Sequence, residues 1–380
     1  MKIGFLTPEF PHPEMGVSGG IGTSIYNLAK GLLDLGHEVS VIIYGQKTDE
    51  TIVKEGITFY KVRNSKLKGF SRYLTQKKIQ KLINTLVKSG KIEIIEAPDW
   101  TGITSNIKPI CPLVIRLNGS DTYFCHLDQR PVKYVNRIME KMALKRADGL
   151  LSVSRYTAEV TQQLFHLKRT FEIIPNSIDV DKFVKDNSVS EQENTILYFG
   201  TLIRKKGLLE LPFIFNEVIR KNPKAKLILI GRDAADVISG AKSTWSMMKP
   251  LFTEAAEKQV SYLGSVPYAA ISQHINAATV CVFPTFAEAL PVSWIEAMAM
   301  QKAIVASDIG WANEVIDNNA NGFLVNPKAH QLYAAKITEL LDDVNLRKEF
   351  GLRAREKVLQ KFSIAVVANQ SVDFYRKFIK

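Results

Sequence analysis

The sequence is poor in cysteine and histidine and contains no long apolar run. Its 380 residues include three cysteines and six histidines. Three scattered cysteines cannot form a disulfide framework or a metal knuckle, so we predict buried free thiols. No window of about 18 residues is apolar enough to span a bilayer, and the opening MKIGFLTPEF lacks the apolar region of a signal peptide. We therefore expect a cytoplasmic protein whose membrane contact, at the inner face, is peripheral.

Acidic residues are nearly absent from one segment, and this segment therefore carries most of the net positive charge of the chain. The whole chain has 50 Lys and Arg against 38 Asp and Glu, a net charge of +12. Residues 54–91 contain eleven basic residues and one acid, so they carry +10 and the rest carries 12 − 10 = +2. A local excess is typical of a docking face. No nucleic-acid recognition motif is present, and we predict no nucleic-acid partner.

Short runs rich in Val and Ile alternate with helical patterns along the whole chain. Strands buried on both faces and joined by helices predict parallel, doubly wound α/β sheets. The polar stretch 184–194 has no apolar periodicity and is typical of a linker between two domains. The strands are expected at 2–7, 38–44, 57–62, 92–97, 112–117, 149–154, 172–175, 195–200, 225–231, 260–264, 279–284, 303–307 and 322–325. The helices are expected at 20–35, 70–89, 130–147, 205–221, 268–278, 292–301, 328–361 and 363–378.

A glycine cluster, GVSGGIGTS, follows the first strand and opens a helix. A dinucleotide fingerprint would need a third glycine where Ile25 stands, and an acid after the second strand, so NAD binding is disfavoured. Gly19, Gly20 and Gly22 let a ligand approach the backbone, and the helix N-terminus favours an anion such as a phosphate. A plain strand-to-helix turn explains this cluster equally well.

The densest pattern is FPTFAEALPVSWIEAMAMQKAIVASDIGWANEVI, residues 283–316. A buried strand leads into a loop with Glu288, and the following helix carries Glu296 in its second turn. Ligands bind at the carboxyl ends of such parallel strands. We expect both carboxylates and the peptide groups near Val292 and Ser293 to face one crevice, where they could hold sugar hydroxyls and a diphosphate. The alternative is a pair of solvated carboxylates.

This segment resembles the Glu-x7-Glu element of retaining glycosyltransferases of the GT-B fold, specifically glycosyltransferase family four. Seven other pieces follow in the order of the family: 19–42, 152–157, 173–183, 198–211, 227–233, 262–271 and 321–327. The resemblance implies two Rossmann-like doubly wound domains that face a central cleft. The N-terminal domain, 1–185, would hold the acceptor and would receive a returning C-terminal helix, 363–380. The donor domain would be 186–362.

The implied reaction moves a hexose-type sugar from a UDP- or GDP-sugar to an acceptor hydroxyl, with retention at the anomeric carbon. The resemblance places it in the synthesis of cell-surface polysaccharide, lipopolysaccharide or glycolipid, on a glycan or lipid-linked acceptor. It implies no cofactor and no essential metal, and the histidines have no paired ligand spacing. A nucleotide-sugar-binding protein without turnover and a nucleotide-sugar epimerase are the alternatives.

The resemblance assigns roles to single residues. Lys206 matches the lysine of the family that neutralises charge on the leaving diphosphate. Thr201 stands where the family usually has an arginine, and we choose Arg204 over Lys205 as its substitute. Glu296 matches the ribose carboxylate, and Glu288 matches a carboxylate that positions the transferred sugar without attacking it.

Five further positions complete the implied site. Backbone groups near Val266 would meet the base, and Leu290 would border the donor. Asn118 replaces the histidine of the family, so it can hydrogen-bond a hydroxyl but cannot carry a proton. Pro291 replaces a glycine and removes a backbone N–H, which predicts an altered sugar pocket. Asp99 would contact acceptor or donor, or would cap a helix.

The helix expected at 70–89 repeats apolar residues at intervals of three and four and carries basic residues on the opposite face. An ordinary packed helix with a solvated face explains this pattern. Its near lack of acids favours a second interpretation, contact of segment 54–91 with an anionic membrane.

Overall fold

The structure is a computed structural model that describes residues 1–16 and 18–379. Val17, in the predicted glycine cluster, and Lys380, at the end of the predicted last helix, lie outside the described residues. Contacts divide the chain into two compact units: Met1–Ile178 with Phe362–Lys380, and Asp179–Lys361. The division falls at 178–179, whereas the sequence placed it at 185–186, so the polar stretch 184–194 belongs to the second unit.

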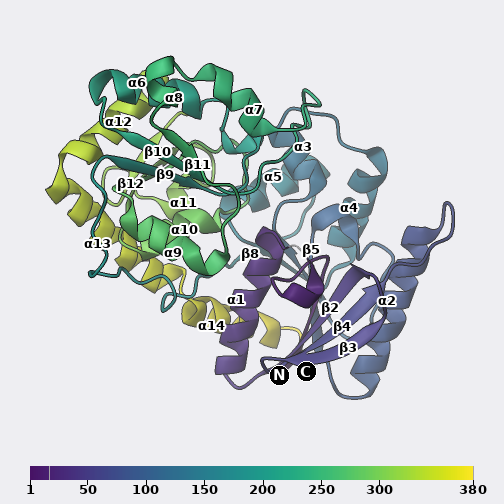
Figure 1. The fold of residues 1–380 in the computed structure, drawn as a ribbon. Helices are drawn as coiled ribbons and strands as arrows, with labels where there is room; N and C mark the ends of the chain where they lie inside the picture. Colours follow the sequence, from purple (N-terminus) through teal and green to yellow (C-terminus); the bar gives the residue numbers. More distant parts are fainter. Residues whose placement is uncertain (17, 380) are drawn as a thin grey trace. The chain divides into compact units, whose positions relative to one another are not determined.

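The first unit contains an eight-stranded sheet in the order β3-β4-β2-β1-β5-β6-β7-β8 (Figure 1). Its strands are β1 (Lys2–Thr7), β2 (Glu38–Gln46), β3 (Glu50–Lys54), β4 (Ile57–Arg63), β5 (Ile94–Pro98), β6 (Leu113–Leu117), β7 (Gly149–Ser152) and β8 (Glu172–Ile173). Its helices are η1 (Pro13–Met15), α1 (Gly20–Asp34), α2 (Ser71–Lys88), η2 (Trp100–Gly102), α3 (Asp121–Leu127), α4 (Tyr134–Arg146), α5 (Arg155–Phe165) and α14 (Ile364–Arg376). The edge strand β3 pairs antiparallel with β4, and the sequence analysis missed it.

Helices pack on both faces of this sheet, because its strands are apolar on both faces. Residues of α1 and α14 share one apolar cluster with β1 and β2, and residues of α2 share another with β1, β2 and β5. Gly31 of α1 permits the close approach of α14, since a Cβ there would come within 2.8 Å of the Cβ of Ala368. The C-terminal helix therefore belongs to the first unit, as the resemblance implied.

A buried polar network also ties α14 to the sheet. Arg116 of β6 donates to both carboxylate oxygens of Glu96 of β5, at 2.8 and 3.2 Å. The same guanidinium donates to the Ser371 hydroxyl at 3.2 Å and to the carbonyl of Ile174 at 3.0 Å. The Tyr375 hydroxyl donates to Glu96 at 2.6 Å. The network thus joins two central strands, the end of the sheet and the returning helix.

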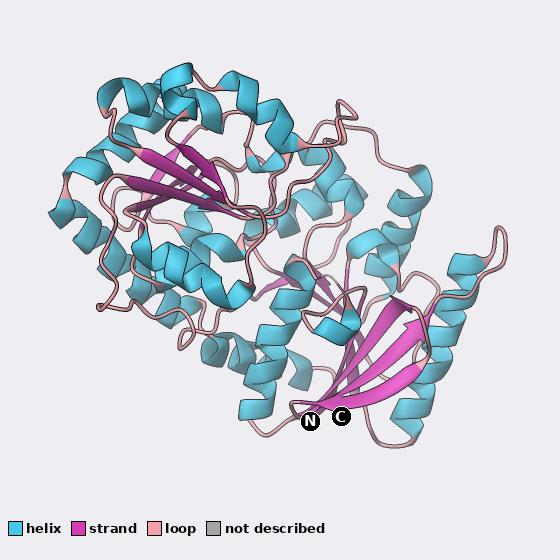
Figure 2. Ribbon diagram, viewed as in Figure 1, coloured by secondary structure: helices cyan, strands magenta, loops and turns pink. Residues whose placement is uncertain are grey.

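The second unit contains a six-stranded sheet in the order β11-β10-β9-β12-β13-β14, in which every strand pair is parallel. Its strands are β9 (Thr195–Phe199), β10 (Lys226–Ile230), β11 (Val260–Tyr262), β12 (Val280–Phe283), β13 (Ala303–Ser307) and β14 (Phe323–Val325). Its helices are η3 (Arg204–Lys206), α6 (Leu211–Lys221), α7 (Thr244–Met248), η4 (Lys249–Leu251), α8 (Glu254–Glu257), α9 (Tyr268–Ala277), α10 (Val292–Ala299), α11 (Ala312–Val315), α12 (His330–Asp342) and α13 (Val344–Lys361). Figure 2 shows the strands of this sheet between layers of helices.

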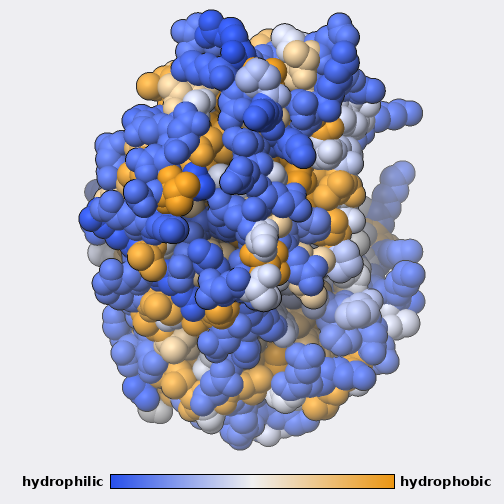
Figure 3. All heavy atoms as spheres, turned by 60° about the vertical axis from the view of Figure 1, so that its left-hand side comes forward, coloured by the Kyte–Doolittle hydropathy of each residue, from blue (hydrophilic) through white to orange (hydrophobic). Residues whose placement is uncertain are grey.

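Several whole-chain predictions can be compared with these units. The two α/β sheets, parallel except for the β3–β4 pair, confirm the predicted fold class. All three cysteines are buried and free, as predicted. Among the described residues, no helix combines the length and the apolar character needed to cross a membrane. The face drawn in Figure 3 is mostly hydrophilic, with hydrophobic residues in separate groups.

Candidate functional site

Two loops of the second unit come together at the carboxyl ends of β9 and β12. Gly207, which ends η3, has a φ of +73°, and a Cβ there would overlap the carbonyl oxygen of Pro284. The carbonyl of Lys205 accepts the backbone N–H groups of Phe286, at 2.8 Å, and Ala287, at 3.2 Å. Glycine is therefore required for this approach, and the backbone bonds hold the two loops in register.

The approach of these loops brings the predicted Lys206 and Glu288 into an ion pair. Both side chains are mostly buried. Burial is the largest influence on Glu288 and would raise its pKa, but the positive charges of Lys206 and Lys205 lower the pKa below its usual value. Glu288 is therefore ionised at neutral pH. A fixed carboxylate and a fixed ammonium at strand ends can bind hydroxyl and phosphate groups together.

Glu296 lies on α10, and its side chain is buried. The hydroxyl of Tyr268, the first residue of α9, donates a hydrogen bond of 2.6 Å to it. Burial raises the pKa of Glu296 to about 7, although the Tyr268 bond and the charge of Lys206 act in the opposite direction. Tyr268 is not among the site residues predicted from the sequence. The only sequence pattern that could have indicated it is a polar residue opening a helix just after the predicted base loop.

Arg204 does not reach Glu288 in the structure. Its guanidinium forms a forked ion pair with Asp236, at 2.9 and 2.7 Å. Asp236 also accepts the backbone N–H of Ser239, and the Arg204 bond lowers the pKa of Asp236. Arg204 was predicted as a second cation for the diphosphate, and its ion pair with Asp236 was not predicted. Of the two residues considered for that role, Lys205 is among the largest influences that lower the pKa of Glu288.

The other predicted donor-side residues lie on the same edge of the sheet. Val266 is partly exposed in the loop between β11 and α9. Leu290 is buried just before α10, and Val292 and Ser293 form the partly exposed first turn of that helix. Pro291 occupies the N-cap position of α10 and provides no side-chain cap. The peptide N–H groups that open α10 are therefore available to an anion.

In the first unit, the glycine-rich N-terminus of α1 binds a carboxylate of the protein itself. The backbone N–H of Gly22 donates to Glu9 Oε1 at 3.0 Å. A Cβ on Gly19 would lie 3.2 Å from the same oxygen, whereas one on Gly20 would meet nothing within 4 Å. The sequence analysis predicted an external anion or a plain turn here. In the structure Glu9 accepts the Gly22 amide, one of those proposed for a phosphate, and the binding roles of Gly19 and Gly20 stay predictions.

Asp99 and Asn118 lie at the carboxyl ends of the neighbouring strands β5 and β6. The backbone N–H of Asn118 donates to Asp99 Oδ1 at 2.9 Å, and the Asn118 side chain donates to the carbonyl of Arg116 at 3.4 Å. Asp99 stands before η2 but makes no cap hydrogen bond, so the capping interpretation is wrong. Burial raises the pKa of Asp99 to about 7, although the hydrogen bond from the Asn118 backbone acts to lower it.

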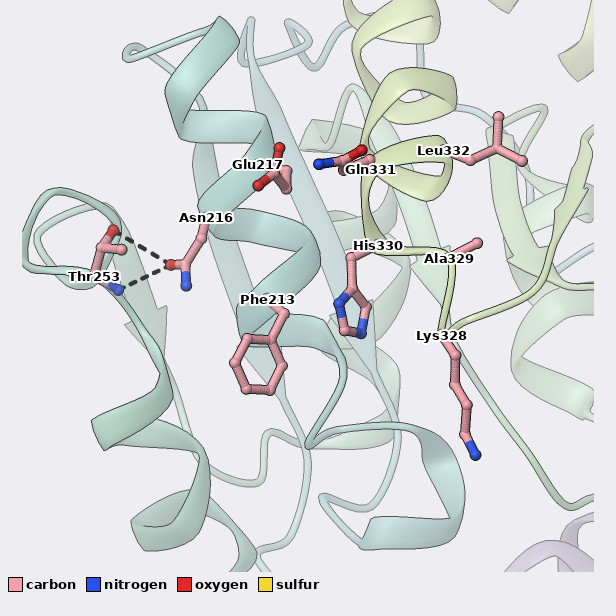
Figure 4. A pocket seen from close by; sticks show the side chains of 9 residues that line it. All are labelled: Phe213, Asn216, Glu217, Thr253, Lys328, Ala329, His330, Gln331 and Leu332. Atoms are coloured by element: carbon pink, nitrogen blue, oxygen red, sulfur yellow. Dashed lines mark hydrogen bonds between the residues drawn. The ribbon is translucent and has the colours of Figure 1, made fainter.

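A surface pocket of about 670 Å³ opens between α6 and the start of α12 (Figure 4). The rings of Phe213 and His330 stack in it at 5.2 Å, and His330 Nε2 lies 2.7 Å from Glu210. Lys328, on its wall, lies over the ring of Phe286 in the Glu288 loop. Lys206, Glu288 and Glu296 do not line this pocket, so it is separate from their cluster. Within residues 1–16 and 18–379, no group of His, Cys, Asp and Glu could hold a metal ion.

The sequence matches two known protein-family patterns. The pattern of Glycosyl transferases group 1 matches residues 179–357, and that of Glycosyltransferase Family 4 matches residues 18–182. The two matches overlap at residues 179–182 and otherwise follow the two units of the structure.

The chain belongs to the group 1 glycosyltransferases of family 4.

Relatives and solved structures agree with this family. An uncharacterized glycosyltransferase of Methanocaldococcus jannaschii is 26% identical, with 99% of this chain and 98% of that protein aligned. Alpha-maltose-1-phosphate synthase of Mycolicibacterium smegmatis is 24% identical, with 99% of each aligned. The capsular polysaccharide biosynthesis glycosyltransferase CapM of Staphylococcus aureus is 25% identical, over 65% of this chain and 66% of CapM.

Two solved structures share the fold over 99% of both chains. Sucrose-phosphate synthase of Thermosynechococcus elongatus has a TM-score of 0.80 at 18% identity. HepE of Anabaena in complex with UDP-glucose has a TM-score of 0.76 at 18% identity. Both confirm the two-unit α/β architecture. In this glycosyltransferase, the cluster of Lys206, Glu288 and Glu296 lies within the region that matches Glycosyl transferases group 1.

Proposed function

We propose that this glycosyltransferase moves a hexose-type sugar from a UDP- or GDP-sugar to an acceptor hydroxyl, with retention of configuration. In this reaction the bond from the anomeric carbon to the diphosphate oxygen breaks and a bond to the acceptor oxygen forms on the same face. The acceptor proton leaves with the diphosphate. The observation that carries the proposal is the Lys206–Glu288 pair beside Glu296, at the carboxyl ends of a parallel sheet.

Each member of this cluster suits one part of the donor. Lys206 and the peptide N–H groups that open α10 would hold the diphosphate and stabilise the charge that develops as it leaves. Glu296 would accept hydrogen bonds from the ribose diol in the place of the hydrogen bond that the Tyr268 hydroxyl donates to it. Glu288, ionised beside Lys206, would orient hydroxyls of the transferred sugar. No step requires a cofactor.

The acceptor would bind to the first unit, near the strand ends that carry Gly22, Asp99 and Asn118. Because Glu9 places a carboxylate at the Gly22 amide of α1, a neutral hydroxyl acceptor suits this edge better than a phosphate. The name of CapM supports a role in polysaccharide synthesis, and that of HepE, solved with UDP-glucose, supports a nucleotide-sugar donor. We propose a glycan or lipid-linked acceptor.

Donor affinity should fall as the pH drops through 7. The pKa of Glu296 is raised to about 7, and the ionised carboxylate accepts from both hydroxyls of a ribose diol, whereas a protonated carboxyl has one oxygen converted to a donor. Binding therefore requires loss of a proton below this pH, so Kd should rise by up to roughly tenfold for each unit below pH 7. Calorimetric titration with the intact nucleotide sugar measures this slope, because its diphosphate diester does not titrate there. Glu296→Gln should bind weakly with no slope, and an unchanged slope in that variant would contradict the assignment.

A nucleotide screen followed by a turnover assay tests the proposed function. UDP or GDP should raise the melting temperature, because a ligand that binds only the native state stabilises it. The wild type should release that nucleotide from its sugar conjugate, and Glu288→Ala should release it about 10²–10³-fold more slowly.

The same assay separates the alternatives. Nucleotide binding without release under any condition would favour a binding protein, which the departures at Thr201, Asn118 and Pro291 suggest. Conversion of the sugar without release of nucleotide would favour an epimerase. Either result would overturn the proposal.

A further inference from the structure

We propose that the first unit docks on an anionic lipid bilayer through one defined surface, formed by the segment before α2 together with the start of α4. This inference concerns the first unit alone and does not depend on the donor chemistry. Its failure would therefore leave the proposed function untouched.

Large apolar side chains gather at this place, which we call the apolar–basic patch. Six of them are 38–76% exposed: Leu67, Phe70, Tyr73, Tyr134, Val135 and Ile138. The first three belong to the turn before α2 and its first helical turn, and the other three open α4. Exposed apolar side chains gathered in two segments of this kind indicate an interaction site.

A hydrogen bond joins the two segments of the patch. Arg72 of α2 donates to the side-chain oxygen of Asn136 of α4 at 3.3 Å, and also to the carbonyl of Thr101. The starts of α2 and α4 are thus neighbours, and both can be followed in Figure 1. Thr101 lies two residues after Asp99, so the patch adjoins the strand ends proposed for the acceptor.

The structure also shows which lysines of the basic segment carry uncompensated charge. Acids from outside the segment pair with three of its lysines: Lys54 with Glu14, Lys61 with Glu50 and Lys78 with Asp49. Among the residues that the structure describes, Lys66 and Lys68, beside the apolar side chains, have no carboxylate within ion-pair distance. The same holds for Lys133 and Arg137 at the start of α4.

This combination fits a membrane surface better than a nucleic acid. Lys and Arg attract anionic headgroups, while aromatic and aliphatic side chains enter the boundary between headgroups and acyl chains. Tyr73 and Tyr134 suit that boundary because their rings are apolar and their hydroxyls are polar. Leu67, Val135 and Ile138 would have no partner on a phosphate backbone.

Co-sedimentation of the full chain with vesicles tests the surface. The wild type should bind phosphatidylcholine vesicles that contain phosphatidylglycerol, bind pure phosphatidylcholine much less, and detach as salt increases. Lys66→Gln/Lys68→Gln should weaken the partition coefficient by about 30-fold, at roughly fivefold for each basic residue. Phe70→Ala/Tyr134→Ala should weaken it by about tenfold or more, because both side chains leave water on binding.

The matched control is Lys54→Gln/Lys61→Gln, which removes the same charge from ion-paired positions of the same basic segment. It should change the partition coefficient by less than about threefold. Equal losses in both lysine pairs, or wild-type binding that ignores anionic lipid, would overturn the proposal. So would a shift from dimer to monomer in Phe70→Ala/Tyr134→Ala during sedimentation velocity, since the patch would then be an interface between copies. All six substituted side chains are at the surface or partly exposed, and unchanged melting temperatures would verify folding.

Discussion

Replacing Lys206 by alanine is expected to lower kcat for sugar transfer by about 10²–10³-fold. Lys206 is held against the ionised Glu288 at the point where the donor diphosphate would lie. Without it, the charge that develops on the leaving diphosphate loses its nearest fixed cation. Glu288 also loses the cation that does most to lower its pKa, so burial would move this pKa upward. Steady-state kinetics with the natural nucleotide sugar measure the loss in kcat and in KM separately.

Lys205→Ala is the matched control for this prediction. Lys205 neighbours Lys206 and holds the Glu288 loop through its backbone carbonyl, which alanine keeps. Its charge contributes less to Glu288 than that of Lys206 does, so the loss should be well below tenfold. Lys206→Arg should recover part of kcat, because the charge is retained with a different geometry. Equal losses in both alanine variants would mean that general positive charge, and not the placed ammonium, supports the reaction.

The donor-side cluster could largely be predicted from the sequence because its residues sit at fixed distances from predictable strand ends. Glu288 and Glu296 follow one buried strand, and Lys206 follows another, so a parallel sheet brings them to one edge. Tyr268 and Asp236 could not be predicted in this way. Each reaches its partner through loop conformations that no periodicity encodes, as in the Arg204–Asp236 ion pair and the Tyr268–Glu296 hydrogen bond.

Predictions from a single segment were incomplete where a carboxylate from another segment pairs with it. The N-terminus of α1 was expected to favour an anion, and it does, but the anion is Glu9 from the preceding loop. The charge of segment 54–91 was counted in isolation, whereas Glu14, Asp49 and Glu50 neutralise part of it from outside. In both cases the positive group attracted an anion as expected, and a carboxylate from elsewhere in the fold supplied it.

Most strands of the fold were predictable because burial on both faces leaves continuous apolar runs. Strand β3, ETIVK, was missed because it is an exposed edge strand with charged ends, which is how natural sheets protect an edge. The buried pair of Glu96 and Arg116 also had no sequence signature, since each lies in an apolar run. Its significance depends on α14, which returns from the far end of the chain.

Arg116→Met should lower the free energy of unfolding of the first unit by about 3–5 kcal/mol, since it leaves Glu96 buried without its cation. Arg116 and Glu96 are each 3% exposed, so water cannot replace the lost bonds. Hydrogen exchange of the β5 and β6 amides under native conditions reports this unit by itself, which matters because a chain of two units need not unfold in one step.

Arg376→Met provides the matched control on α14 itself. Arg376 pairs with Asp373 at 3.1 Å, but both side chains are more than 60% exposed, so the loss should stay within about 1 kcal/mol. The triple variant Arg116→Met/Glu96→Leu/Tyr375→Phe removes the charges and the hydroxyl together, and it should recover most of the stability because no buried charge is left unpaired. If Arg116→Met costs no more than Arg376→Met, the buried network does not hold the returning helix. In that case the apolar contact of α14 with α1, through Gly31, would be the main attachment.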